Sequence, residues 1–192
     1  MERRPGWIVI LNGAPRSGKS SIAAAIQETF DGVWMNLGVD VFVTHVTPRR
    51  YQPGMGLRPG EEGHPVAPLV PALYEAFYGS VAAHSRAGLN VVVDVGHHDR
   101  GVLAASARQL AGLPVLFVGV RCPIDVVVAR RTATWGSDGG AHTADWQRLV
   151  HDHEGYDVEV DTSLLTPEQC AEAIRRRLAE GPPPDAVARL AR

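Results

Sequence analysis

One segment near the N-terminus, residues 13–20, constrains the fold of this chain more than any other feature. It fits the pattern G-x-x-x-x-G-K-S/T and consists of Gly13, Ala14, Pro15, Arg16, Ser17, Gly18, Lys19 and Ser20. An apolar run at residues 7–11 precedes it directly, and a helical stretch at residues 19–30 follows it. Because a chance match in a glycine-containing turn needs neither neighbour, this context favours a phosphate-binding loop.

Each residue type in this loop suits the binding of a polyphosphate. Glycines let successive backbone N–H groups point inward around an anion, and the helix N-terminus adds its positive end. We expect the Lys19 ammonium to reach the β- and γ-phosphates and the Ser20 hydroxyl to coordinate Mg²⁺, with Ser21 beside them. The loop therefore predicts binding of a nucleoside triphosphate with Mg²⁺.

Apolar runs alternate with helical stretches along the whole chain. We expect strands at residues 7–11, 33–39, 91–95, 115–120 and 156–160, and helices at residues 19–30, 69–87, 100–111, 123–132 and 166–179. This order predicts an α/β protein with a P-loop kinase fold, in which a mainly parallel five-stranded sheet has helices on both faces. We expect one domain over residues 1–180 and a tail at residues 181–192 that leaves the globule.

A phosphate loop serves GTPases, motor ATPases and small-molecule kinases alike. The chain of 192 residues is too short for a motor's second domain, and it has no N-K-x-D motif for reading guanine. The sequence therefore favours a kinase. Such an enzyme needs a carboxylate near the acceptor hydroxyl, a site for the acceptor and a cover that excludes water.

Two carboxylates follow predicted strands and are expected at the carboxyl edge of the sheet, where ligands of α/β proteins bind. Asp40 would accept the proton of the substrate hydroxyl or hold the hydroxyl in line. Its alternative role, an N-cap for a short helix at residues 41–46, is compatible with the first. Asp94 would bind Mg²⁺, directly or through water, or contact the substrate.

Two segments interrupt the alternation of strands and helices. Residues 47–71 carry six prolines and form a long excursion, in which Tyr51, Met55 and Leu57 either build the acceptor pocket or belong to a disordered insertion. Residues 134–144 are glycine-rich and polar, and they are expected to act as a lid. Long loops in α/β domains are typically lids, substrate loops or disordered insertions.

Histidines and arginines complete the predicted site. His97 and His98 are expected to line the acceptor pocket, with Asp99 capping the next helix; a metal site is the weaker alternative there and at residues 151–153. Positive charge around the transferred phosphate would come from three arginines at predicted strand and helix ends, Arg121, Arg130 and Arg131. The alternative is that these are ordinary surface arginines.

Composition narrows the partners. The chain has 19 Lys plus Arg against 21 Asp plus Glu, a net charge of −2, which argues against broad capture of nucleic acid. A mean hydropathy of −0.07 with short apolar runs predicts no membrane-spanning helix. The two cysteines, Cys122 and Cys170, are too few for a disulfide framework. We expect them to be reduced, buried thiols of a cytoplasmic protein. The composition is compatible with a monomer and with a homo-oligomer.

These residues resemble the chloramphenicol phosphotransferase-like family of small P-loop kinases. The matching blocks follow one another through residues 7–180, at residues 10–13, 18–20, 38–40, 118–122, 150–151 and 156–163. The resemblance implies ATP-dependent phosphorylation of a hydroxyl on a small molecule, an antibiotic in the best-known case. It also implies that Asp40 is the catalytic carboxylate, and that the loop with Asp161 and Thr162 lies near the adenine.

The chain departs from the family pattern in two places. The family's lid usually carries an R-G-D-R-like block, whereas residues 134–139 hold no arginine. Either Arg130, Arg131 or Arg16 supplies this charge, or transfer is weak. Residues 95–98 also differ from the family's acidic or aromatic continuation, so the resemblance does not assign chloramphenicol as substrate. A metabolic or nucleotide-sugar kinase and a nucleotide-binding regulatory module are the alternatives.

Overall fold

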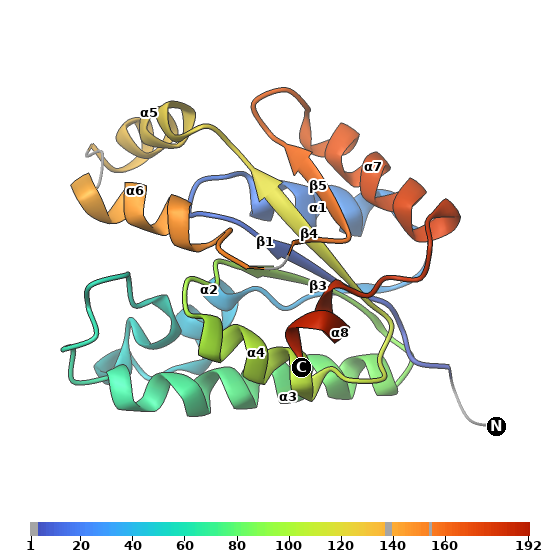
Figure 1. Ribbon diagram of the computed structural model, residues 1–192, viewed down its shortest axis with the longest axis horizontal. Helices are drawn as coiled ribbons and strands as arrows, with labels where there is room; N and C mark the ends of the chain where they lie inside the picture. The colour runs from blue at the N-terminus through green and yellow to red at the C-terminus, as the bar shows by residue number, and fades with distance from the viewer. Residues whose placement is uncertain (1–3, 137–139, 154) are drawn as a thin grey trace.

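Five parallel strands form the centre of the computed structural model, which describes residues 4–136, 140–153 and 155–192. Their order across the sheet is β2-β3-β1-β4-β5, and every neighbouring pair is parallel. The strands are β1 (Ile8–Asn12), β2 (Trp34–Asn36), β3 (Asn90–Val95), β4 (Val115–Arg121) and β5 (Val158–Asp161). Parallel strands end at the same edge of the sheet. Figure 1 shows the β4 arrow pointing toward α5 (Ile124–Trp135) and α6 (Gly140–Leu149).

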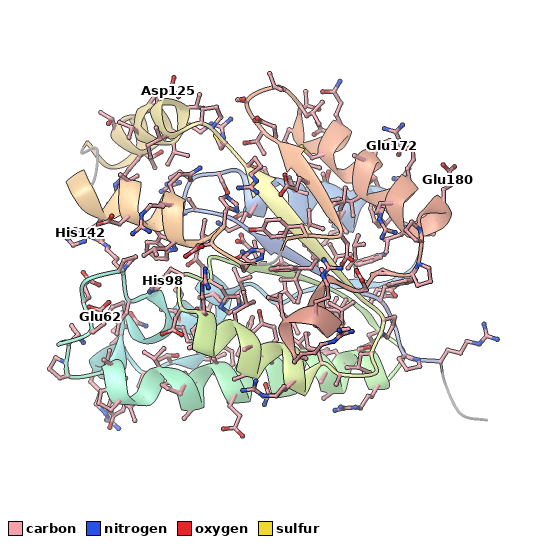
Figure 2. The ribbon with its side chains drawn as sticks, viewed as in Figure 1. Glu62, His98, Asp125, His142, Glu172 and Glu180 are labelled. Carbon is pink, nitrogen blue, oxygen red and sulfur yellow. The ribbon has the colours of Figure 1, made fainter. Side chains whose placement is uncertain are left out.

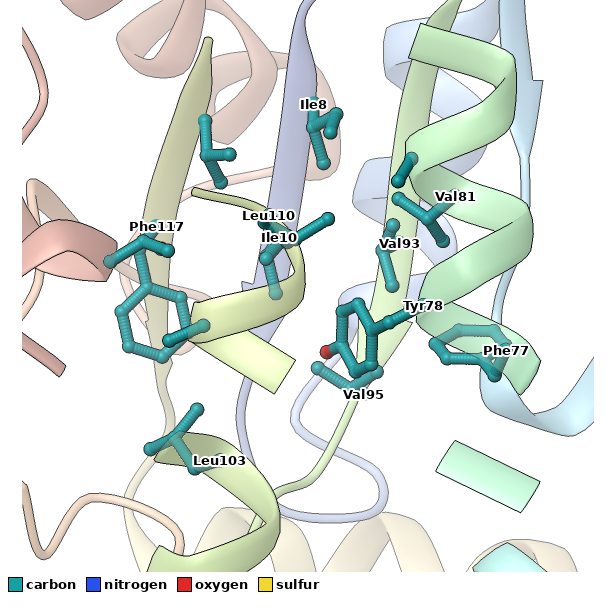
Figure 3. Packing of buried hydrophobic residues seen from close by; sticks show 14 of the residues in the cluster. Ile8, Ile10, Phe77, Tyr78, Val81, Val93, Val95, Leu103, Leu110 and Phe117 are labelled. Atoms are coloured by element: carbon teal, nitrogen blue, oxygen red, sulfur yellow. The ribbon is translucent and has the colours of Figure 1, made fainter. Parts of the chain in front are cut away.

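Helices cover both faces of this sheet (Figure 1). One face packs against α1 (Lys19–Thr29) and α7 (Pro167–Glu180), and the other against α3 (Val70–Arg86), α4 (Arg100–Gln109) and α8 (Ala186–Leu190). Because side chains alternate along a strand, Ile8 and Ile10 of β1 join the second cluster whereas Val9 and Leu11 join the first. Figure 3 shows the α3 and α4 side of this core. Burial on both faces explains why the central strands are continuous apolar runs.

The second predicted strand is shorter than expected. Only Trp34–Asn36 pairs with β3, and the last backbone hydrogen bond between the two segments runs from Leu37 N–H to Val92 O (3.0 Å). The chain then turns at Gly38 into α2 (Val39–Val41), which continues as the π-helix η1 (Phe42–Val46). A Cβ on Gly38 would lie 3.3 Å from Asp94 Cβ, so a glycine lets α2 start close against the end of β3.

The excursion, residues 47–71, packs onto the α3 side of the sheet. It contains three short 3₁₀ turns, η2 (Arg49–Tyr51), η3 (Gly54–Gly56) and η4 (Ala67–Leu69). Met55, Leu57 and Val66 are buried, and Met55 belongs to the core cluster of α3. The excursion is therefore fixed next to the carboxyl edge of the sheet, where the acceptor pocket was predicted.

The expectation that residues 181–192 leave the globule is wrong. Helix α8 packs against α4 and β4, and Ala186 and Val187 are buried in the same core cluster as Phe117. The Asp157 carboxylate accepts hydrogen bonds from the backbone N–H groups of Asp185 (2.9 Å) and Ala186 (3.1 Å). The sequence signal was weak because one short helix turn buries only two small side chains.

Replacing Gly119 with alanine should lower the free energy of unfolding by about 1–3 kcal/mol, the usual cost of overpacking. A Cβ at this β4 position would lie 2.5 Å from Cδ2 of the Tyr156 ring. Urea denaturation measures the effect. Gly79→Ala in α3 is the matched control, because a Cβ there meets nothing within 4 Å and should be neutral or stabilising by up to about 1 kcal/mol. Equal stability of the two variants would contradict this packing.

Candidate active site

The phosphate loop has the backbone conformation that an anion requires. Arg16 and Gly18 have left-handed φ values of 69° and 94°, and α1 begins directly afterwards at Lys19. Alternation of left- and right-handed residues turns N–H groups toward one concave side. The loop closes on itself through Ala14 O, which accepts hydrogen bonds from Ser17 N–H (3.1 Å) and from the Lys19 ammonium (2.9 Å).

Asp94 connects the loop to β3. The Ser20 hydroxyl donates to Asp94 Oδ2 at 2.5 Å, and Lys19 Nζ lies 3.6 Å from Asp94 Oδ1. Both the Lys19 and Asp94 side chains are largely buried, with 10% and 15% exposure. A cation and a carboxylate so shielded from water interact strongly. Asp94 is therefore held against both Lys19 and Ser20, and its predicted role in binding Mg²⁺ stays a prediction.

A hollow of about 410 Å³ opens above the loop and is called the phosphate-loop hollow here. Its wall brings together predicted residues from five parts of the chain: Pro15, Arg16, Gly18, Lys19, Ser20, Ser21, Asp40, Asp94, Arg130 and Thr162. The remaining loop residues, Gly13, Ala14 and Ser17, are buried behind it. Thr134, Leu165 and Pro167 also line it, and the sequence analysis had assigned no binding role to Leu165 or Pro167.

Arg130 is held in place by the loop after β5. Its guanidinium donates to Thr162 Oγ1 (3.0 Å) and Thr162 O (2.8 Å), and Thr162 Oγ1 donates to Ser17 O (2.7 Å). Thr162 thus links α5 to the phosphate loop. This arrangement fixes one positive charge on the wall of the hollow, and the role of Arg130 toward a transferred phosphate stays a prediction.

Asp40 extends from the first turn of α2 into the phosphate-loop hollow. The alternative that it caps a helix is wrong, because the N-cap position belongs to Gly38 and no side chain caps α2. Within the described ranges, the Asp40 carboxylate has no hydrogen-bond or ion-pair partner. The carboxylate is exposed, so it is free to accept a proton or a hydrogen bond from a ligand.

A second hollow of about 360 Å³, called the side cavity, lies between the excursion and the end of β3. Met55 and Leu57 line it from the excursion, and His97 and His98 from the segment after β3. Tyr74 of α3 lines it too; its pKa is raised by burial and further by the charges of Asp99 and Asp40. Asp40 therefore lies within electrostatic reach of both hollows.

His97 belongs to a buried polar network behind the phosphate loop. Its Nε2 lies 2.6 Å from the Tyr78 hydroxyl, and its backbone N–H donates to Asn12 Oδ1 at 2.9 Å. The Asn12 amide in turn donates to Val150 O (2.9 Å) and to the Tyr156 hydroxyl (3.0 Å). Asn12 immediately precedes Gly13, so this network fixes the start of the loop to three distant segments.

Lowering the pH from 7 to 5 should weaken the fold through His97. Burial, and then the charge of His98, lowers the pKa of His97 to about 3, whereas Asp99 acts in the opposite direction. Between pH 6.5 and 3, His97 is protonated in the unfolded chain but not in the native chain. The free energy of unfolding therefore decreases as the pH is lowered, by about 2 kcal/mol at pH 5. In urea denaturation, His97→Gln should show a correspondingly smaller drop. An unchanged drop would exclude His97 as its source.

Helix α6 covers the junction of the two hollows. The Trp146 indole N–H donates to Gly96 O (3.0 Å) and its ring contacts the His98 ring edge-on. His142 Nδ1 lies 3.1 Å from Pro59 O of the excursion. Figure 2 shows His142, His98 and Glu62 on the side where α6 faces the excursion. The predicted lid-like segment, residues 134–144, contains the end of α5 and the start of α6. Its residues 137–139 lie outside the described residues.

Several predicted residues lie away from both hollows. Arg121 pairs with Glu159 (2.7 Å) and lies over the Tyr156 ring. Asp161 accepts hydrogen bonds within its own loop from Ser163. Tyr51 is partly exposed beneath the Arg50 guanidinium and lines neither hollow. Of these contacts, only those of Arg121 join segments that are distant in sequence.

The donor set at Ser20 and Asp94 fits Mg²⁺. Mg²⁺ usually keeps several waters and takes only one or two protein oxygens beside substrate phosphates. A hydroxyl and a carboxylate oxygen 2.5 Å apart on the wall of the hollow meet this requirement. Within residues 4–136, 140–153 and 155–192, no group of three or more His, Cys, Asp or Glu side chains forms a protein-only metal site. The same residues contain no helix long and apolar enough to cross a membrane.

Comparison with known structures supports the fold. The chain is similar to the Mycobacterium tuberculosis APS kinase in complex with AMPPNP and APS (TM-score 0.69, 15% identity, 92% of this chain and 99% of that one). It is also similar to the Deinococcus radiodurans tunicamycin resistance protein (TM-score 0.65, 20% identity, 90% and 95% covered). The predicted P-loop kinase fold, a five-stranded parallel sheet surrounded by helices, is thereby confirmed.

Sequence comparison identifies the family. Residues 6–179 match the profile of the family described as chloramphenicol phosphotransferase-like protein. A Mycobacterium tuberculosis H37Rv protein named "Putative O-phosphotransferase" is 28% identical over 199 residues, covering 96% of this chain and 88% of that protein. This chain belongs to the chloramphenicol phosphotransferase-like family, and the resemblance noted in the sequence is confirmed.

Proposed function

We propose that this protein is a cytoplasmic kinase that uses ATP and Mg²⁺ to phosphorylate a hydroxyl of a small, partly apolar molecule. The observation that carries the proposal is the position of Asp40. An unpaired carboxylate lies on the wall of the phosphate-loop hollow and within electrostatic reach of Tyr74 in the side cavity. An unpaired carboxylate on the wall of a phosphate site suits a general base for phosphoryl transfer.

The roles of the other residues follow from their positions. The loop amides and Lys19 would hold the triphosphate, and Ser20 and Asp94 would hold Mg²⁺, which neutralises charge on the phosphates when bound. The acceptor oxygen would attack the γ-phosphorus as the bond to the β-phosphate oxygen breaks. Asp40 would take the hydroxyl proton, and the products would be ADP and a phosphate monoester.

The side cavity indicates the kind of acceptor. Its walls combine apolar side chains such as Met55, Leu57 and Val102 with the polar side chains of His98 and Asp99. Such a surface suits a molecule with an apolar part and hydroxyl groups. The family description and the tunicamycin resistance protein among similar structures support an antibiotic, chloramphenicol or a related compound, as the first class to test.

Two measurements test the proposal. Calorimetry with ATP and Mg²⁺ should show binding, and incubation with hydroxylated antibiotics, sugars and other metabolic alcohols should give one product with one added phosphate by mass spectrometry. If sugars are the only acceptors that give a phosphorylated product, the protein is a metabolic kinase. Nucleotide binding without product from any acceptor would contradict transfer and favour a regulatory module. Absence of nucleotide binding would contradict the whole proposal, because the proposed transfer needs bound ATP as the phosphate donor.

A further inference from the structure

Arg58 lies on the boundary between the two hollows. It lines the side cavity together with Met55 and Tyr74. It also lines a gap of about 10 Å³, whose other walls are Pro15, Arg131, His142, Thr143 and Trp146. Pro15 in turn lines the phosphate-loop hollow. Pro15 is therefore shared by the phosphate-loop hollow and this gap, and Arg58 is shared by the gap and the side cavity.

The backbone around Arg58 is fixed although its side chain is exposed. Leu57 and Pro59 on either side are buried, and Arg58 N–H donates to Glu61 Oε2 at 2.9 Å. Pro59 O contacts His142 of α6, and Met55 O accepts a hydrogen bond from the Tyr74 hydroxyl (3.3 Å). Only the side chain of Arg58 is thus left free to reorient toward a ligand.

The Arg58 guanidinium makes no hydrogen bond or ion pair within the described part of the chain. Arg130 differs, because its terminal nitrogens donate to Thr162, and Arg121 pairs with Glu159. A guanidinium presents several donors in a planar fork that matches phosphate oxygens. Arg58 is therefore a positive charge at the junction whose donors are available.

Phosphoryl transfer requires positive charge on both sides of the transferred group, since negative charge spreads over its oxygens. Residues 134–139 hold no arginine for this purpose. We infer that Arg58 supplies this charge from the acceptor side: its guanidinium contacts the phosphoryl group during transfer and the phosphate monoester afterwards. This inference rests on the proposed kinase function and adds a residue that the phosphate-loop pattern does not contain.

Binding of ADP and Mg²⁺ with and without aluminium fluoride, which mimics the transferred phosphoryl group, tests the inference by calorimetry. In the wild-type protein, aluminium fluoride should lower the Kd for ADP by at least about tenfold. Arg58→Gln should lose most of this gain while its affinity for ADP alone stays within about twofold. Arg58→Lys should recover part of it, because it keeps the charge and loses the fork. Arg50→Gln is the control, since Arg50 lies on the excursion over Tyr51 and lines neither hollow.

The outcomes separate the two proposals. If fluoride tightens ADP binding equally in the wild type and in Arg58→Gln, the role of Arg58 is overturned and the kinase function stands. If Arg58→Gln weakens ADP alone as much as it weakens ADP with fluoride, the residue acts on nucleotide binding and the inference also fails. If the wild type binds ADP but shows no gain with fluoride, the proposed transfer function fails, and the inference fails with it.

Discussion

Replacing Asp40 with asparagine should lower the turnover number about 10³-fold, within the range that a general base contributes. Asparagine has nearly the same shape but cannot take the acceptor proton. The Asp40 carboxylate has no partner among the described residues, so its replacement leaves no buried group unpaired. Turnover is measured with the acceptor that the mass-spectrometric screen identifies.

ATP affinity should stay within about twofold in Asp40→Asn, because the phosphate loop and Lys19 remain intact. Asp125→Asn is the matched control: Asp125 is an exposed carboxylate in the first turn of α5 that lines neither hollow (Figure 2). Its turnover should equal that of the wild type. If Asp40→Asn retains turnover within about tenfold of wild type, Asp40 is not the base.

Replacing Lys19 with methionine should lower kcat/KM about 10³-fold, since a charge aimed at the phosphates is worth several kcal/mol in a shielded site. Methionine keeps the length and apolar stem of the side chain. The loss should appear in ATP affinity as well as in turnover, which distinguishes it from Asp40→Asn. Fluorescence or calorimetric titration with ATP and Mg²⁺ measures the affinity.

Lys19 offers a second, independent test because it is the only lysine in the sequence. An amine-directed acylating reagent can therefore modify Lys19 and the N-terminus, and no other side-chain amine. ATP with Mg²⁺ should protect Lys19 and leave labelling of the N-terminus unchanged, as read by peptide mass spectrometry. Because the Lys19 side chain is only 10% exposed, the reagent concentration is raised until Lys19 is labelled in the absence of ATP. Equal labelling with and without ATP under that condition would show that the nucleotide does not cover Lys19.

The sequence predicted the central sheet well because the relevant signals are local. The runs at residues 7–11, 91–95 and 115–120 are strands with both faces buried, so almost every residue in them is apolar. The capping box at Thr166, with its hydrogen bond from Gln169 N–H, marks the start of α7 in the same local way. The edge strand β2 was overestimated, because the chain turns at Gly38 into α2 while its partner β3 continues to Val95.

The phosphate half of the site was also predictable, whereas the acceptor half was not. Lys19, Ser20 and Gly18 follow from one contiguous pattern whose backbone conformation is set by neighbouring residues. His97 and His98 line the side cavity, and their contact with an acceptor stays a prediction. Arg58 was missed, and Tyr51 was expected in a cavity that it does not line, because the excursion's composition gives no periodicity from which to orient a side chain.

By itself, the sequence determined the parallel sheet, the phosphate loop and the family, since continuous apolar runs and glycine spacing act over a few residues. Only the tertiary structure decided which charged side chains line the hollows. It directed Arg121 to Glu159, anchored Arg130 on Thr162 and brought Arg58 beside Pro15. Those positions depend on how α5, α6 and the excursion pack over the same sheet edge, and packing between distant segments is not encoded in any single stretch of chain.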